Sequence, residues 1–571
     1  MARSGSKKPS PYSDDPRINQ LLSRVIQELR SFTEEQADHI KDLAAIGRAM
    51  SAERDPERIL EMILTQARRF TAADGGTLYL RTDDEKELAF HVLHNDTLKS
   101  YMGGTSGNPV TLPNVPLYDE NGEPNHANVS AHVAVSGETV NIPDVYEAEG
   151  FNFDGPKKFD EMMGYRSMSM LVVPMRDHED EIIGVLQLIN AKDPESGESI
   201  PFSPDLVEMT EALASQAAVV LTQQRLIQDL KNLFESFIKA IATAIDEKSK
   251  YTGGHITRVA ELTMMIAEKI NEVDEGPFAD VHFNRDELEE LRIAAWMHDT
   301  GKITTPEYVV DKSNKLETIF DRIDLLRTRW DVIRLARELE VEREKGGAGA
   351  KGAGAKRVKE AEEKLAADLA AMGEDLAFLE RTNTGGEFMA DDKIERLQAI
   401  AARTYGVDGE THPFLTDDEV YNLSIRKGTL TAEEREIINN HAMMTIKILN
   451  ELPWPKKLRR VPEFAGAHHE KLDGSGYPLG LTADQISLQA RIMAVADIFE
   501  ALSAKDRPYK KPMPLSQAIK ILGFMVKDNH IDKDVVDLFI DSGLVHEYAE
   551  RFLSPEQVDI HPGGEEEKAA G

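Results

Sequence analysis

A long seven-residue repeat of apolar side chains divides this chain into two parts. Between Ser203 and Asp246 an apolar residue recurs at every seventh position, and others lie on the intervening seam. This spacing predicts one continuous α-helix. Its length favours a coiled coil in a homodimer over a core helix of one domain. The repeat consists of Leu206, Leu213, Val220, Ile227, Phe234 and Ile241, with Leu230 and Phe237 on the seam.

Length and charge limit the classes of fold and partner. The 571 residues favour two or three domains. The 101 acidic and 67 basic residues give a formal charge of -34, which argues against general binding to DNA or to anionic membranes. Because the sequence contains no cysteine, any metal ligands must be His, Asp or Glu. No run of roughly 18 apolar residues occurs, so we expect a cytoplasmic protein without a membrane span.

Periodicity changes several times along the chain and predicts a multidomain protein. Short alternating strands between helical stretches predict an α+β domain, and the part after the long helix is helical. The predicted boundaries are a disordered start at 1–16, one or two amphipathic helices at 17–50, the α+β domain at 51–202, the coiled-coil signalling helix at 203–246, an all-α domain at 247–550 and an acidic tail at 551–571.

Residues 316–423 are expected to form a helical hairpin inserted into the all-α domain. Two arms each carry an apolar stripe at helical spacing, and the Gly- and Ala-rich segment Gly346–Ala355 between them predicts a flexible turn. The stripes are Leu316, Ile319, Ile323, Leu326, Trp330 and Ile333 in one arm, and Val358, Ala361, Leu365, Met372, Leu376 and Leu379 in the other.

The all-α part also contains most of the residues that could bind metal ions. Imidazoles combined with carboxylates suit iron, manganese, nickel or zinc, and a carboxylate can bridge two ions. A single histidine is as often structural as a ligand, but adjacent pairs favour a metal site. Seven such groups are too many for one ion. They are His255, His298, Asp299, His441, His468, His469 and Asp497.

Two short segments place these groups beside sharp turns. His298 and Asp299 follow the apolar run Leu291–Met297, which predicts that they occupy the last turn of a helix ending at Gly301. Lys302 then supplies a cation next to the metals, where a substrate phosphate needs its charge neutralised. His468 and His469 likewise precede a loop rich in glycine that ends in proline.

These motifs resemble the HD-GYP phosphodiesterases. The matching segments occur in family order over roughly residues 235–545, and the resemblance implies an all-helical domain that hydrolyses cyclic di-GMP to pGpG or GMP. The segments are Tyr251–His255 with Arg258, His298-Asp299, Lys427–Glu434, Gly476-Tyr477-Pro478, Ala490–Asp497 and Arg507–Lys510.

The resemblance also implies roles for individual residues. One metal would be bound by His255, His298, Asp299 and Asp497. Asp299 would bridge to a second metal bound by His441, His468 and His469. Substrate contacts would come from Lys302, Tyr477, Arg507 and Lys510. Asp299 and Lys302 would be the catalytic groups of a two-metal reaction with iron or manganese.

Three features depart from the family pattern. The insertion interrupts the stretch after the His-Asp helix. One extra residue lies between Asp497 and Arg507, and the usual Asp after the last ligand is Glu500. Some members bind a third metal through a glutamate where this chain has Tyr251, which favours two metals here.

The stretch Leu43–Gln224 resembles a GAF sensor domain. Tyr165–Pro174 and Gly184–Asn190 match its central strands. Lys157, Asp160 and Glu161 are similar to a motif of GAF domains that bind cyclic nucleotides. The alternatives are a solvated charged helix end, or a domain that only dimerises.

The function most consistent with these features is a metal-dependent cyclic di-GMP phosphodiesterase controlled by a GAF sensor. One alternative is a non-catalytic receptor for the cyclic dinucleotide. Another is a hydrolase for a different nucleotide, such as cyclic GMP-AMP or a deoxynucleotide triphosphate.

Overall fold

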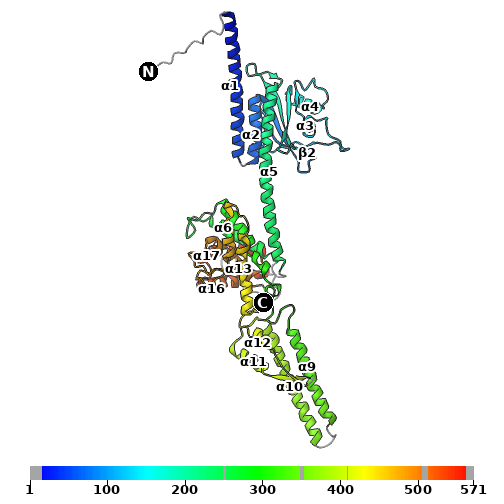
Figure 1. The fold of residues 1–571 in the computed structure, drawn as a ribbon, viewed down its shortest axis with the longest axis vertical. Helices are drawn as coiled ribbons and strands as arrows, with labels where there is room; N and C mark the ends of the chain where they lie inside the picture. The colour runs from blue at the N-terminus through cyan, green and yellow to red at the C-terminus, as the bar shows by residue number, and fades with distance from the viewer. Residues whose placement is uncertain are drawn as a thin grey trace, which may run out of the picture. The chain divides into compact units, whose positions relative to one another are not determined.

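The computed structural model describes residues 16–53, 55–248, 253–347, 353–407, 409–504 and 512–560 (Figure 1). The chain divides into two compact units, residues 1–233 and 234–571, and each is described by itself. Within the described residues, no helix combines the length and apolar character needed to cross a bilayer. Most of the predicted disordered start and of the acidic tail, residues 1–15 and 561–571, lie outside the described residues.

The first unit is an antiparallel sheet with helices on both faces. The order of its main strands is β3-β2-β1-β7-β6-β5, while β4 pairs with β2 and β8 with β7. The strands are β1 (Ala73–Arg81), β2 (Glu87–Asn95), β3 (Ser100–Gly103), β4 (Val115–Pro116), β5 (Val140–Ile142), β6 (Met170–Arg176), β7 (Ile182–Lys192) and β8 (Ser199–Ile200). The helices are α1 (Pro16–Ala52), α2 (Pro56–Thr71), α3 (Val129–Ser136), α4 (Asp154–Met163) and α5 (Pro204–Asp246).

Alternating side chains supply two separate cores to this sheet. Leu78 of β1 packs with α2 and α5 on one face, whereas the next residue, Tyr79, packs with α3 on the other. Leu171 and Val172 of β6 divide between the two faces in the same way. This period of two is the pattern of a sheet buried on both sides. The predicted α+β domain is therefore confirmed.

Helix α5 is continuous, as the seven-residue repeat predicts, but the repeat has different neighbours along its length. Leu213 is buried in the first unit, and Ile238 and Ile245 are buried in the second. The middle of the helix exposes a run of apolar side chains instead. These are Leu226, Ile227, Leu230, Leu233, Phe234 and Phe237, each at least 36% exposed. The helix therefore packs within each unit near its two ends, while its middle is exposed.

The second unit is built around an all-helical core, as predicted. Its largest hydrophobic cluster joins α6, α7 and α14–α18. Helix α7 begins with a capping box in which Asn284 and Glu287 exchange side-chain-to-backbone hydrogen bonds. The elements are α6 (His255–Ile270), α7 (Arg285–Met297), η1 (Thr300–Thr304), α8 (Glu307–Val310), α13 (Ala432–Asn450), η2 (Lys456–Leu458), α14 (Val461–Gly466), α15 (Leu488–Ser503), α16 (Leu515–Lys527), α17 (Lys533–Asp541), α18 (Leu544–Phe552) and η3 (Pro555–Gln557).

The insertion contains more than the two helices of the predicted hairpin. The two arms exist as long helices, but further elements follow them. Ile319 lies before the helix of the first arm and is 96% exposed, so it is not part of the buried stripe. A separate hydrophobic cluster, whose buried members all lie between Leu316 and Leu423, makes this segment a subdomain with its own core. Its elements are α9 (Ile323–Gly347), α10 (Ala353–Asn383), α11 (Asp391–Ala401), β9 (Thr404–Val407), β10 (Glu410–Pro413) and α12 (Asp417–Leu423).

The base of the insertion is tied to the start of α13. The buried Lys312 ammonium donates to both carboxylate oxygens of Glu434, at 2.8 and 2.7 Å, and to Asn422 Oδ1 at 3.2 Å. Glu434 also forms the capping box of α13 with Thr431. The same carboxylate therefore caps α13 and binds the lysine that precedes the insertion.

Deleting the insertion should leave metal binding intact. We expect a variant in which a Gly/Ser linker replaces residues 316–423 to retain the wild-type metal content, because its core is separate and contains no predicted ligand. Lys312 and Glu434 remain in that variant. The measurement is metal per chain by elemental analysis of the folded protein. As a control, shortening only the arms by removing residues 338–366 spares the buried members of the cluster. If the full deletion loses metal and the shortened-arm variant does not, the base of the insertion is part of the metal site.

Candidate metal centre

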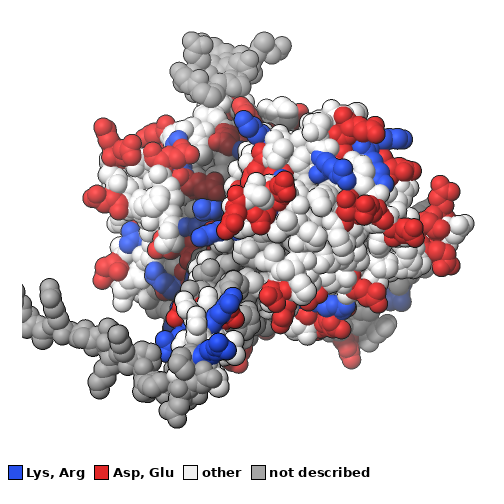
Figure 2. All heavy atoms as spheres, turned by 90° about the horizontal axis from the view of Figure 1, so that it is seen from above, with Lys and Arg blue, Asp and Glu red and all other residues white. Residues whose placement is uncertain are grey.

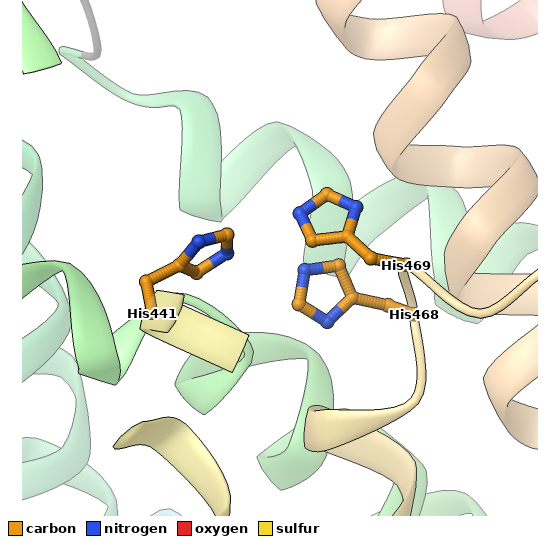
Figure 3. A group of neighbouring side chains, drawn as sticks. All are labelled: His441, His468 and His469. Carbon is orange, nitrogen blue, oxygen red and sulfur yellow. The ribbon is translucent and has the colours of Figure 1, made fainter. Parts of the chain in front are cut away.

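Six of the seven predicted ligands form two groups of buried or nearly buried side chains. His441, His468 and His469 each offer one nitrogen, and these nitrogens lie within 4.8 Å of one another. Figure 3 shows their imidazoles directed into a common space, His441 from α13 and the other two from the segment after α14. The second group, within the same distance limit, consists of His255, His298 and Asp299.

The second group lies where α6, α15 and the turn after α7 meet. Asp497 of α15, the seventh predicted ligand, approaches it with its Oδ1 3.4 Å from His255 Nε2 and 3.9 Å from His298 Nε2. The ring centroids of His298 and His468 are 4.8 Å apart, so the two groups are adjacent. The structure thus brings all seven residues to one place.

The turn that carries His298 and Asp299 is held against α13. His298 caps α7, and the 3₁₀ turn η1 begins directly after Asp299. The Thr445 hydroxyl donates to the His298 carbonyl at 3.0 Å and accepts from the Gly301 N–H at 2.9 Å. A Cβ at Gly301 would lie 1.9 Å from the His441 carbonyl oxygen, so only glycine permits this approach.

Asp299 is the residue that the two groups share. Its Oδ2 lies 3.4 Å from His255 Nε2 and 3.3 Å from His298 Nε2. Its other oxygen, Oδ1, lies 3.4 Å from His441 Nε2. Each carboxylate oxygen therefore faces a different group, which is the arrangement required of a bridging ligand.

Hydrogen bonds orient three of the histidines for metal binding. The Nδ1 atoms of His298, His441 and His468 each donate to the main-chain carbonyl three residues earlier, at 2.8, 2.5 and 2.6 Å. Their Nε2 atoms are buried and have no hydrogen-bond partner. A buried polar atom without a partner is costly, and metal ions bound at the two groups would satisfy all three. The residues present therefore fit a divalent metal site.

The electrostatics of the centre also suit cation binding. Burial lowers the pKa of His469 to about 4, and burial together with His469 holds the pKa of His468 well below its usual value. These imidazoles are neutral ligands at pH 7. Burial acts to raise the pKa of Asp299, but Lys302 and His298 outweigh burial and keep this pKa well below its usual range. Asp299 is therefore an anion.

Lys302 lies against this anion. Its Nζ donates to Asp299 Oδ2 at 2.5 Å, and its side chain is 23% exposed. Lys302 thus places a cation directly beside the metal ligands.

The loop after His469 carries Tyr477 to the centre. Its ring packs against His469 with centroids 4.8 Å apart and ring planes tilted by 37°. The buried Glu470 carboxylate accepts from the Leu479 and Leu481 N–H groups at 2.6 and 2.9 Å, which holds the loop after Tyr477. A Cβ at Gly476 would lie 2.3 Å from the Lys471 nitrogen. The predicted contacts Arg507 and Lys510, and the position of Tyr251, lie outside the described residues.

The sequence did not indicate the roles of four supporting residues. Thr445, Glu470, Glu500 and Arg258 hold the ligands or the adjoining loop without being ligands themselves. In the sequence Glu500 stands out only as a departure from the family pattern. The spacing of three between Asp497 and Glu500 was the available signal, because it places both carboxylates on one face of α15.

In the first unit, the three predicted cyclic-nucleotide contacts have different surroundings. Asp160 is buried and accepts from the Ser167 N–H at 2.7 Å and the Tyr146 hydroxyl at 3.0 Å. Lys157 lies over the Tyr146 ring, 5.2 Å from its centroid, and Glu161 is exposed. Asp160 therefore anchors the chain before β6.

Comparisons with protein families match both units. Residues 55–221 match the GAF domain model, and residues 252–370 and 416–535 match two HD domain models. The two HD matches include all seven ligands of the metal centre.

Curated relatives match parts of the chain. A Vibrio cholerae 3'3'-cGAMP-specific phosphodiesterase 3 is 48% identical over 97 residues, 17% of this chain and 20% of the relative. A probable cyclic di-GMP phosphodiesterase of Vibrio cholerae is 38% identical over 124 residues, 21% of this chain and 28% of the relative. A Thermotoga maritima cyclic di-GMP phosphodiesterase is 43% identical over 96 residues, 17% of this chain and 26% of the relative. The chain thus spans between a fifth and three tenths of these relatives' lengths.

Proposed function

We propose that this chain, a GAF domain followed by an HD domain, is a metal-dependent phosphodiesterase that hydrolyses a cyclic dinucleotide under control of the GAF domain. The observation that carries the proposal is the position of Asp299, whose two oxygens face two different groups of histidines. A single-ion site would not need a carboxylate shared in this way. The cytoplasmic location expected from the sequence remains a prediction.

The proposed centre holds two divalent ions, iron or manganese. One would be bound by His255, His298, Asp299 and Asp497, and the other by Asp299, His441, His468 and His469. When bound, such ions polarise phosphoryl oxygens and lower the pKa of water, which allows in-line attack at neutral pH. A third ion is not favoured.

Protein groups around the ions would position and neutralise the substrate. Lys302 can place its ammonium on a phosphate oxygen, since it lies beside Asp299 and its side chain is 23% exposed. Tyr477 can stack a substrate base or sugar beside His469. Arg507 and Lys510 are proposed as further phosphate contacts.

The overall charge of the chain is -34, so such local cations are needed to attract a dinucleotide. On the face drawn in Figure 2, acidic and basic side chains of the described residues are interspersed.

Cyclic di-GMP is the favoured substrate, and cyclic GMP-AMP is the second candidate because relatives named for each match this chain. The test is turnover of cyclic di-GMP, 3'3'-cGAMP and cyclic di-AMP by the Mn²⁺-loaded protein, with products separated by chromatography. Formation of pGpG or GMP from cyclic di-GMP is the expected result. Binding without turnover of any of the three would instead indicate a receptor.

The GAF domain is proposed to bind a cyclic nucleotide at the motif of Lys157, Asp160 and Glu161, with the buried Asp160 holding the segment that carries the other two. Support comes from the motif and from the exposed position of Glu161. Calorimetry on the full chain with cyclic AMP and cyclic GMP tests this proposal. No heat of binding at high micromolar ligand would refute it.

A homodimer through the exposed middle of α5 is also proposed. Charged substitutions there should dissociate it, because a coiled-coil seam excludes unpaired charge. We expect Ile227→Glu with Leu230→Glu to convert a dimer to a monomer in analytical ultracentrifugation and to remove any effect of a GAF ligand on turnover. These side chains are 47% and 67% exposed, so the fold of either unit should not depend on them. As a control, Gln228→Glu on the same helix should leave the dimer intact. A dimer that persists in the double variant would contradict this assignment.

A further inference from the structure

Two pairs of side chains, each with a spacing of three, meet between α6 and α15. His255 and Arg258 lie on one face of α6, and Asp497 and Glu500 lie on one face of α15. Asp497 Oδ1 is 3.4 Å from His255 Nε2, and Glu500 Oε2 is 2.5 Å from His255 Nδ1. One helix therefore approaches both nitrogens of a single imidazole.

Glu500 is itself held in place. Its side chain is 1% exposed, and its second oxygen, Oε1, accepts from Arg258 Nε at 2.8 Å and lies 2.7 Å from Arg258 Nη2. Arg258 Nη1 also donates to the Gly253 carbonyl at 3.2 Å. A buried carboxylate that moved away from this cation would lose its charge compensation. The carboxylate is therefore fixed between an arginine and a histidine.

His255 differs in this respect from three other histidines of the centre. His298, His441 and His468 are oriented by neutral main-chain carbonyls of their own segments. His255 is oriented by an ionisable side chain that is distant in the sequence. A carboxylate partner makes an imidazole a stronger ligand for a metal ion than a carbonyl partner does. Unlike a main-chain carbonyl, the carboxylate can be removed by substitution.

We propose that Glu500, fixed by Arg258, is a positioning residue that sets the metal affinity of the His255 site and leaves the His441 site unaffected. The two sites then differ in how they are built: the His255 site depends on a remote ion pair, and the His441 site depends on local backbone. This inference rests on the proposed two-metal centre.

The test measures each site alone by Mn²⁺ titration, followed by electron paramagnetic resonance. His441→Ala removes a ligand of one site, so the remaining ion reports the His255 site, and His255→Ala isolates the other. Glu500→Gln keeps the length of the side chain but removes its charge. In the His441→Ala background it should weaken Mn²⁺ binding by about 10- to 100-fold. In the His255→Ala background it should change nothing.

Three further variants sharpen the result. Arg258→Met should weaken the same site, and adding Glu500→Gln to it should cause little further loss, because both residues act through one imidazole. Glu290→Gln is the matched control, because Glu290 is also buried in this unit but accepts from the Arg460 N–H. It should leave both titrations at wild-type values. If Glu500→Gln fails to fold by circular dichroism, Arg258→Met decides the question by the same titration.

Unchanged affinity at the His255 site, or equal losses at both sites, would overturn the inference. The second result would indicate general loosening of the fold. Failure of the proposed function is distinguishable, because a wild-type protein that binds two Mn²⁺ ions and hydrolyses no cyclic dinucleotide leaves these titrations interpretable.

Discussion

Asp299→Asn should reduce the metal content from two ions per chain to one or none and abolish hydrolysis. The amide keeps the shape of the side chain and one oxygen acceptor, but it has no negative charge to offset two adjacent cations. In the structure both oxygens are engaged, Oδ2 near His255 and His298 and Oδ1 near His441. An amide presents a nitrogen to one of these groups and therefore cannot bridge them.

Elemental analysis and turnover of cyclic di-GMP check this prediction together. Asp286→Asn is the control, since Asp286 lies in the first turn of α7, the helix that His298 caps, and pairs with Lys457. It should keep two metals and wild-type turnover. An Asp299→Asn protein with two metals and near-normal activity would refute the bridging role.

Lys302→Ala should separate catalysis from metal binding. Every ligand remains, so the metal content should stay near two ions per chain. Turnover should fall by roughly 10²-fold or more, the scale observed when one charge-stabilising donor is lost from a preorganised site. The loss should appear in kcat/KM, because the proposed contact of this ammonium with the substrate phosphate is missing.

Lys447→Ala provides the comparison for a general loss of positive charge. Lys447 is exposed and lies on α13, the helix that carries His441. We expect no change in metal content or turnover from this substitution. If Lys302→Ala loses its metals, then Lys302 acts through the ligands, and its assignment to the substrate phosphate is wrong.

Local rules were sufficient for much of the fold. The continuous helix α5, the short strands of the first unit and the helix before His298 follow from the spacing of apolar residues. Leu171 and Val172 lie in a continuous apolar run, so their division between two cores does not follow from spacing. Within the insertion the same rules found only the two long arms. The sequence pair Asp408-Gly409 is nevertheless a hairpin signal, and Thr416 with Glu419 is a capping-box pair, so the hairpin of β9 with β10 and the start of α12 do have local signals.

The sequence by itself determined which residue types are available as ligands and in which local turns they occur. His298-Asp299 at the end of an apolar helix and His468-His469 before a glycine-rich loop are readable because caps and periodicity act over a few residues. Only the tertiary structure decided which oxygen of Asp299 faces which group, and that Glu500 orients His255. His255 and Glu500 are 245 positions apart in the sequence. Their meeting depends on how α6 packs against α15, and such packing arises from the shape of a whole core.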